Sequence, residues 1–195
     1  TASDAGGYDN FGFYVAIDGG TVVVGARYAG IGGAAYVFRT SDGGATYDEV
    51  AKLTASDGAL DDRFSAFLAI EGGTVVIGAP RDDDSGTNSG SAYVFRTNDG
   101  WATYNFVAKL TADDAAAGDY FGKEVEIEDG VVAIGACAPP GIEPSGGEAV
   151  YIFHASDDGL TYSQVAKLTA ADGVAGDRFG QSLAMDGGTI VVGAM

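Results

Sequence analysis

The acidic segment RDDDSGTNSGS, residues 81–91, has the residue types best suited to chemistry in this 195-residue sequence. Asp82, Asp83, Asp84 and Asn88 bring carboxylate and amide oxygens together, and such oxygens are the ligands that Ca²⁺ prefers. The same composition also suits an acidic loop that is simply solvated. The segment therefore leaves two interpretations open: a calcium site at Asp82, Asp84 and Asn88, and a loop without a metal.

Hydrolytic or transfer chemistry needs a base, a nucleophile and an oxyanion site held together. The sequence has a single histidine, His154, at a position where the related segments carry Arg39 and Arg96. This position is the expected end of a strand at the surface. We therefore predict that the chain is not an enzyme.

Charge and composition exclude several classes of partner. The chain has 10 Lys and Arg residues against 28 Asp and Glu residues, a formal net charge of -18. Nucleic acids and anionic membranes would be repelled, so neither is an expected partner. No apolar stretch approaches the ~20 residues that span a bilayer, so membrane insertion is not expected. Cys137, the one cysteine, has apolar neighbours and is predicted to be a buried thiol.

The sequence repeats itself, which decides its architecture. Units begin at the threonines of TASDAGGYDNFG, TASDGALDDRFS, TADDAAAGDYFG and TAADGVAGDRFG, and they cover residues 1–53, 54–110, 111–168 and 169–195. Within each unit a Phe and a Gly keep constant spacing, at Phe11 and Gly25, Phe64 and Gly78, Phe121 and Gly135, and Phe179 and Gly193. Only one segment per unit varies in length, and it follows the Gly.

Each complete unit predicts four short antiparallel strands, here called A to D. In the first unit, strand A has Val15 and Ile17 on one face, and the Asp-Gly-Gly turn at 18–20 joins it to strand B at 21–26. Strand B is apolar on both faces and should be the most buried element. Strands C and D are AAYVFRT and YDEVAKL.

Four strands per unit predict an all-β protein, a β-propeller with four-stranded antiparallel blades. Residues 1–195 would form one domain with three complete blades and the first two strands of a fourth. An apolar strand B left as an unpaired edge is an aggregation hazard. We therefore expect further repeats of a longer parent chain, or other subunits of an assembly, to complete the propeller.

These motifs resemble FG-GAP repeats, the units of integrin α-subunit propellers and of many extracellular proteins. Phe11-Gly12 with Gly25-Ala26, and Phe64 with Gly78-Ala79-Pro80, carry the resemblance, which covers the whole chain. It implies an extracellular or cell-surface binding and adhesion module. Integrin-type repeats bind calcium between strands A and B, but the turn at 18–20 is too short for the 6 to 8 oxygen ligands, roughly, that Ca²⁺ takes. That calcium site is not expected here.

The segments TSDGGATY, TNDGWATY and ASDDGLTY, between strands C and D, resemble the Asp boxes of sialidases. Asp42, Asp99 and Asp157 would be structural carboxylates that bond turn amides. Sialidase chemistry also requires an arginine cluster. Arg27 and Arg81 follow strand B, but Cys137 and Met195 replace them in the other units, so no such cluster is expected. A glycan hydrolase is the least favoured interpretation.

Two further sets of aspartates recur, and we predict that they cap amides where strand D leads into strand A, with a cation site as the alternative. One set stands two residues before each Phe and the other three residues after each Thr: Asp9, Asp62, Asp119 and Asp177, and Asp4, Asp57, Asp114 and Asp172.

Alternating strand directions place the variable B-to-C loops together on one face, the usual location of binding residues on a rigid scaffold. The predicted ligand face spans 27–33, 80–91 and 137–148, with candidate residues Arg27, Tyr28, Arg81, Asp82, Asp83, Asp84, Asn88 and Glu143. The predicted function is non-catalytic binding of a protein or glycan outside the cell. A structural subunit of an extracellular assembly or filament is the alternative.

Overall fold

The computed structural model describes all residues except 143, 145–146, 157 and 175, and its described part is all-β with no helix. The strands are β1 (Phe11–Asp18), β2 (Thr21–Ala26), β3 (Ala34–Arg39), β4 (Asp48–Leu53), β5 (Phe67–Glu71), β6 (Thr74–Ala79), β7 (Ser91–Arg96), β8 (Asn105–Leu110), β9 (Phe121–Glu128), β10 (Val131–Ala136), β11 (Ala149–Ala155), β12 (Tyr162–Leu168), β13 (Ser182–Asp186) and β14 (Thr189–Gly193). The described residues contain no helix long and apolar enough to cross a membrane.

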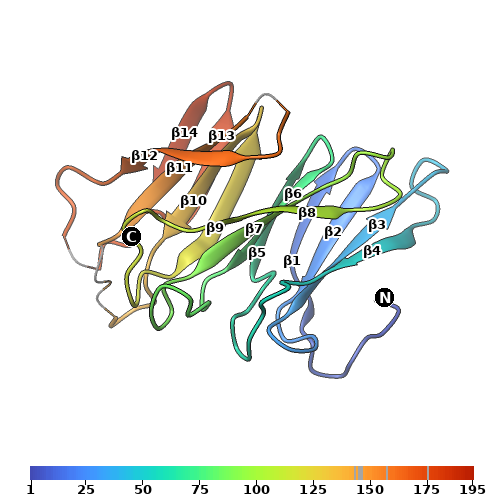
Figure 1. Ribbon diagram of the computed structural model, residues 1–195, viewed down its shortest axis with the longest axis horizontal. Helices are drawn as coiled ribbons and strands as arrows, with labels where there is room; N and C mark the ends of the chain where they lie inside the picture. The colour runs from blue at the N-terminus through green and yellow to red at the C-terminus, as the bar shows by residue number, and fades with distance from the viewer. Residues whose placement is uncertain (143, 145–146, 157, 175) are drawn as a thin grey trace.

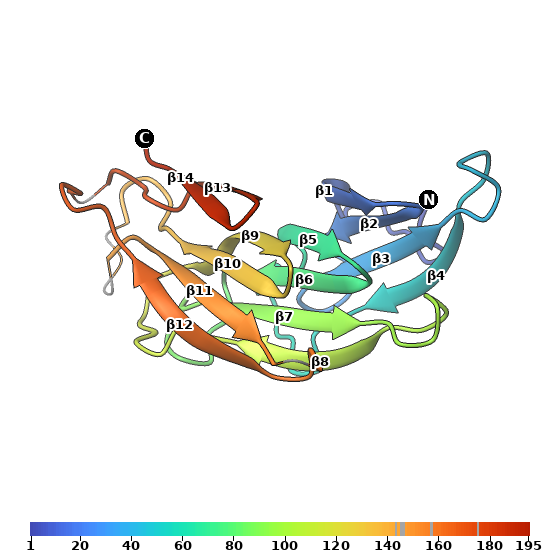
Figure 2. The same cartoon turned by 90° about the horizontal axis from the view of Figure 1, so that it is seen from above.

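The strands form three antiparallel four-stranded sheets and one two-stranded hairpin, each in sequence order. The sheets fan out side by side, with β1, β5, β9 and β13 on the inner side and β4, β8 and β12 at the periphery (Figure 2). This arrangement confirms the predicted propeller blades, three complete and one consisting of its first two strands. β1 and β2 pair through Asp18 and Thr21, so the short Asp-Gly-Gly turn makes a tight hairpin.

The hydrophobic core lies between neighbouring sheets. Val23 and Val37 of the first sheet pack against Leu68 and Ile77 of the second, and equivalent clusters join the second sheet to the third and the third to the hairpin. Every residue of β6 is buried, and β2 and β10 are nearly so, as predicted for strand B. The strand B of the fourth unit, β14, differs: Val191 is 63% exposed because no sheet covers its outer side.

The repeated Phe packs on strand C of its own blade. The ring of Phe64 lies edge-on to Tyr93 and Phe95, with centroids 5.4 and 6.1 Å away. Phe11 contacts Tyr36 and Phe38 in the same way, and Phe121 contacts Tyr151 and Phe153. Such edge-to-face pairs are favourable beyond the area that they bury.

The repeated Gly of strand B is required by close approach to the next repeat. A Cβ on Gly25, Gly78 or Gly135 would overlap the backbone carbonyl oxygen of Ser65, Gly122 or Gly180, respectively. These three partners all occupy the position after the repeated Phe, where φ is positive. The Phe-Gly and Gly-Ala motifs of successive units therefore meet at each blade interface.

Ser65 is the one non-glycine residue at that position, and its φ of 71° is strained for a side chain. Its hydroxyl donates to the carbonyl of Ala34 at 2.6 Å and accepts from the amide of Ala26 at 3.0 Å. These buried hydrogen bonds tie the second unit to the ends of β2 and β3 and offset the strain.

Candidate functional site

The B-to-C loops and the loops that lead into strand A lie along one edge of the sheets, the lower edge in Figure 1, and the short turns and C-to-D hairpins lie along the other. Backbone hydrogen bonds join loops of successive units on the lower edge. Phe64 donates to Gly32 at 2.7 Å, and Tyr120 donates to Asn88 at 3.0 Å. We call this surface the loop edge and the opposite one the turn edge.

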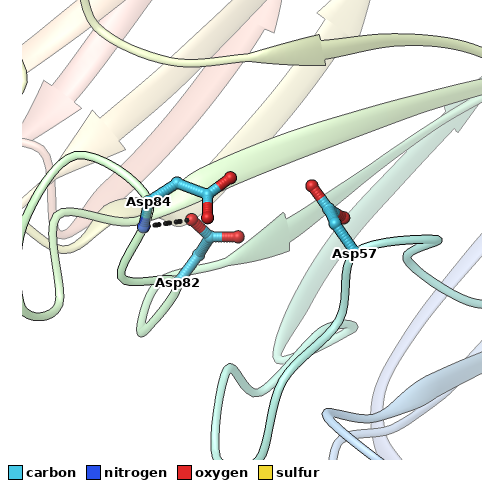
Figure 3. Close-up of side chains that lie close together, drawn as sticks. All are labelled: Asp57, Asp82 and Asp84. Atoms are coloured by element: carbon cyan, nitrogen blue, oxygen red, sulfur yellow. Dashed lines mark hydrogen bonds between the residues drawn. The ribbon is translucent and has the colours of Figure 1, made fainter.

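Three carboxylates converge on the loop edge. Asp82 and Asp84 follow β6, Asp57 precedes β5, and the three side chains lie close together (Figure 3). Lys109 of β8 reaches all of them, with its Nζ 2.7 Å from Asp57, 2.9 Å from Asp82 and 2.5 Å from Asp84. The Asp82 side chain is only 3% exposed, and the Tyr93 hydroxyl also donates to its carboxylate, at 2.9 Å.

The ammonium of Lys109 takes the place that a metal ion would need in this cluster. Burial lowers the pKa of Lys109, but hydrogen bonds from its amine to Asp57, Asp84 and Asp82 outweigh burial and raise that pKa overall. Lys109 therefore stays charged across the physiological range.

Of the predicted calcium set, Asp82 and Asp84 lie together. The backbone amide of Asn88 donates to Asp83 Oδ1 at 2.6 Å, and the φ of Asn88 is positive. Asp57 supplies the third carboxylate, which the sequence interpretation of this site had not included. Calcium binding stays a prediction, and Lys109 would have to leave the cluster for it to occur.

The carboxylate–lysine contact is one version of a unit that recurs in all three complete blades. In each blade a buried strand C tyrosine donates to an aspartate that also binds a strand D lysine: Tyr36, Asp4 and Lys52; Tyr93, Asp57 and Lys109; Tyr151, Asp114 and Lys167. The prediction that Asp4, Asp57 and Asp114 cap turn amides was therefore incomplete: each carboxylate accepts a backbone hydrogen bond and also joins strands C and D of its blade. The constant spacing of these tyrosines and lysines was the signal that could have found the unit.

The other recurrent aspartates do cap amides, as predicted. Each accepts a hydrogen bond from the backbone amide three residues earlier, at 2.6 to 2.9 Å: Asp9 from Gly6, Asp62 from Ala59, Asp119 from Ala116 and Asp177 from Val174. These four carboxylates fix the loops before strand A.

The C-to-D hairpins hold their aspartates in local hydrogen bonds on the turn edge. Asp42 accepts from the amide and hydroxyl of Thr46, and Asp99 accepts likewise from Thr103. The hydrogen bonds from Thr103 lower the pKa of Asp99 to about 2. Asp157 lies outside the described residues. Each described carboxylate stabilises a turn and is remote from the loop edge.

A cavity of about 200 Å³ opens on the loop edge, and its lining includes four basic side chains: Arg27, Arg63, Arg81 and Lys123. The sequence comparison expected no arginine cluster of the sialidase type, and it did not anticipate that three arginines and a lysine line one cavity. Arg27 and Arg81 occupy equivalent positions after strand B, but Arg63 and Lys123 come from unrelated positions of their units, so the repeat comparison missed them. Glu143, a predicted residue of the same face, lies outside the described residues.

Contacts within the cluster hold these side chains in place. The Arg27 guanidinium lies over the Phe13 ring, 3.5 Å from its centroid, and 4.9 Å from that of Tyr28. Arg63 and Arg81 share the carboxylate of Asp61. In contrast, no described carboxylate pairs with Arg27 or with Lys123.

The remaining candidates for chemistry are isolated. Cys137 is buried, as predicted, and burial raises the pKa of its thiol, whose Sγ lies 4.0 Å from Lys123 Nζ. His154 is exposed near the end of β11 and faces no described partner that would make it a base. Within the described residues, neither side chain is part of a nucleophile–base pair.

Comparison with known proteins agrees with this architecture. A search of curated protein sequences found no match. Among solved structures, the crystal structure of Saccharomyces cerevisiae Sqt1 is similar, with a TM-score of 0.54 and 13% identity over 83% of this chain. The chain spans 36% of the length of that protein, and the low identity supports a shared fold alone.

The family comparison covers most of the chain. The model of the FG-GAP repeat matches residues 1–38, 47–95, 104–153 and 162–195, one segment in each of the four units. The matched segments include the Phe-Gly and Gly-Ala contacts described above. This chain therefore belongs to the FG-GAP repeat family.

Proposed function

We propose that the chain is a non-catalytic binding module that works outside the cell and uses its loop edge to hold a protein or a glycan. The observation that carries the proposal is the loop edge itself, where hydrogen-bonded loops of different length enclose a cavity lined by basic side chains. Binding residues are commonly placed on such loops because a rigid scaffold fixes their positions. The extracellular setting is supported by the occurrence of FG-GAP repeats in extracellular proteins.

A binding screen with matched edge variants tests this function. The chain is screened against immobilised extracellular proteins and glycans, and each ligand found is measured with two triple variants. Ile31→Ser, Asp83→Lys and Ile142→Ser alter the loop edge but leave its basic residues unchanged. Tyr47→Ser, Asp48→Lys and Leu160→Ser make the same kinds of change near the turn edge, and all six residues are exposed.

We expect the loop-edge variant to lose at least tenfold in affinity and the turn-edge variant to bind like the wild type. Equal binding by both variants, at unchanged melting temperatures, would refute the proposal. So would loss of binding by the turn-edge variant alone.

A second candidate, a structural repeat unit of an extracellular assembly, is favoured by the outer face of β1. Val15 and Ile17 are 59% and 66% exposed there. The counterparts of Val15 in the second and third units, Leu68 and Val125, are 2% and 1% exposed because the preceding sheet covers them. Another blade of the same repeat type would cover this face in the same way.

Light scattering over a range of protein concentrations tests the second candidate. We expect self-association that Val15→Lys and Ile17→Lys abolish and that Leu60→Lys, at an 85% exposed loop residue, leaves unchanged. A strictly monomeric wild-type chain would count against an assembly built from copies of it.

A further inference from the structure

We propose that the cavity lined by Arg27, Arg63, Arg81 and Lys123 binds the carboxylate or sulfate group of an acidic sugar. This inference rests on the proposed function, because it names the ligand class of the loop edge. The shared chemistry of the two groups is a compact oxyanion on a sugar ring.

The concentration of positive charge is the first argument. Four of the 10 basic residues of a chain with net charge -18 line this one cavity. Asp61 offsets part of this charge through its ion pairs with Arg63 and Arg81. Like charges that converge repel each other, and a bound anion relieves that repulsion.

Unused hydrogen-bonding capacity is the second argument. The Nε atom of Arg27 is buried and has no hydrogen-bond partner. The only polar contact of the Lys123 ammonium in the described part of the chain is the Cys137 sulfur at 4.0 Å, which is a weak acceptor. Guanidinium groups match the geometry of carboxylates and sulfates and bind them through paired hydrogen bonds.

The Arg27 side chain is also pre-organised for ligand binding. Its guanidinium stacks on the Phe13 ring, and this contact restricts its rotamers before any anion arrives. A side chain ordered in advance loses less entropy on binding, which favours affinity for a small ligand.

The rest of the lining favours a sugar over a bare inorganic anion or an extended peptide. Phe67 and Tyr120 contribute aromatic rings beside the charged groups, and Pro80 and Pro139 contribute apolar pyrrolidine rings. A sugar ring presents C–H faces to such surfaces, and its acidic substituent can then reach the cations. A volume of about 200 Å³ limits the occupant to a compact unit and is too small for an extended peptide strand.

Calorimetric titration with small probes tests the proposal. Glucuronic acid and N-acetylglucosamine 6-sulfate distinguish the carboxylate from the sulfate, glucose is the neutral control, and sodium sulfate and sodium acetate test for simple anion binding. A short glutamate-rich peptide tests the alternative ligand class. Each probe is titrated into the wild type, into the double variant Arg27→Gln and Lys123→Gln, and into the control Arg39→Gln and Arg96→Gln on the turn edge.

We expect at least one acidic sugar to bind at least tenfold more tightly than glucose, sulfate or acetate. We also expect the double variant to lose at least tenfold in affinity while the control binds normally. Equal binding of sulfate or acetate would overturn the assignment to a sugar, and so would preferential binding of the peptide. Absence of binding by every acidic probe would overturn the whole inference.

The outcome of this calorimetric titration can be distinguished from the outcome of the binding screen. If a partner from the binding screen depends on Ile31, Asp83 and Ile142 but no acidic sugar binds, the binding module stands and the ligand class is wrong. If an acidic sugar binds at the basic cavity and the screen gives no partner that depends on the loop edge, the sugar site stands and the wider use of the edge fails.

Discussion

Gly78 lies directly against the carbonyl oxygen of Gly122, so closely that a Cβ on residue 78 would overlap that oxygen. Gly78 belongs to the Gly-Ala motif of the second unit and Gly122 to the Phe-Gly motif of the third. The two halves of the repeat signature therefore contact each other between units. This contact explains why both halves recur with fixed spacing.

Substitution of Gly78 by alanine should weaken the interface between the second and third blades. Because the obstructing atom is backbone, the sheets must move apart, and overpacking of this kind costs typically ~1–3 kcal/mol of unfolding free energy. Chemical denaturation measures the loss. Gly7→Ala is the control, since a Cβ there meets no atom within 4 Å, and its stability should match the wild type. Equal stability of the two variants would contradict the steric explanation.

Lys109→Met should destabilise the second blade by about 3 kcal/mol, the cost typical of removing one partner of a buried ion pair. The substitution leaves Asp57, Asp82 and Asp84 without their shared cation, and Asp82 is nearly fully buried. Urea unfolding monitored by circular dichroism measures the change.

The first blade offers the matched control. Among the described carboxylates Lys52 pairs with Asp4 alone, and the two side chains are 35% and 50% exposed, so Lys52→Met should cost less than ~1 kcal/mol. If the two variants lose similar stability, the buried carboxylate of Asp82 is not what makes the second blade sensitive.

Calcium should raise the melting temperature of the Lys109→Met variant and leave that of the wild type unchanged. In the wild type, an ion would have to displace the ammonium that already neutralises the cluster. Without Lys109, three carboxylates within 4.8 Å of one another are free to bind a divalent cation. Melting temperatures with calcium and with a chelator test this. A calcium-dependent rise in the wild type that Asp82→Ala and Asp84→Ala both abolish would show that the ion replaces Lys109.

Local patterns predicted the fold well because the repeat presents the same signals four times. Alternation in strand A, the Asp-Gly-Gly turn and the apolar strand B each depend on residues close together in the sequence, and the structure follows them in register. The exposed side of β14 departs from the expected burial of strand B because burial also depends on the neighbouring sheet, which a local pattern does not include.

The candidate sites were harder to predict because they join residues from different units. Asp57 and Lys109 lie 52 residues apart, and Arg27 and Lys123 lie in the first and third units. Comparing equivalent positions finds features that recur, such as the amide caps at Asp62 and Asp119. It misses a cavity whose four basic residues occupy different repeat positions, because only the fanned arrangement of the blades brings them together.

One contact on the inner side of the sheets likewise could not be predicted without the arrangement of the blades. Tyr14 and Glu124 occupy the same repeat position, three residues after Phe11 and Phe121, and the Tyr14 hydroxyl donates to Glu124 Oε1 at 2.9 Å. This hydrogen bond connects β1 to β9 past β5, where Phe67 packs on Tyr14 with ring centroids 5.5 Å apart. Glu124 is only 8% exposed, and burial raises its pKa from 4.5 to about 7.

Stability should therefore fall as the pH rises from about 4.5 to about 7. The folded protein holds a proton on Glu124 in this range and the unfolded chain does not, so raising the pH favours unfolding. Carboxylates with lowered pKa values, such as Asp57 and Asp114, titrate below this window. Glu124→Gln should remove most of the decrease and be more stable than the wild type by roughly 1–2 kcal/mol at pH 8.

Tyr14→Phe tests the same contact by removing the hydrogen-bond donor and leaving the carboxyl group of Glu124 in place. The tyrosine hydrogen bond lowers the pKa of Glu124 against the larger effect of burial, so its removal should raise that pKa and extend the stability decrease to higher pH. Unfolding free energies of the wild type and both variants, measured between pH 5 and pH 8, separate the two effects. Parallel pH profiles for all three proteins would mean that Glu124 is ionised throughout the range and that burial does not govern its proton.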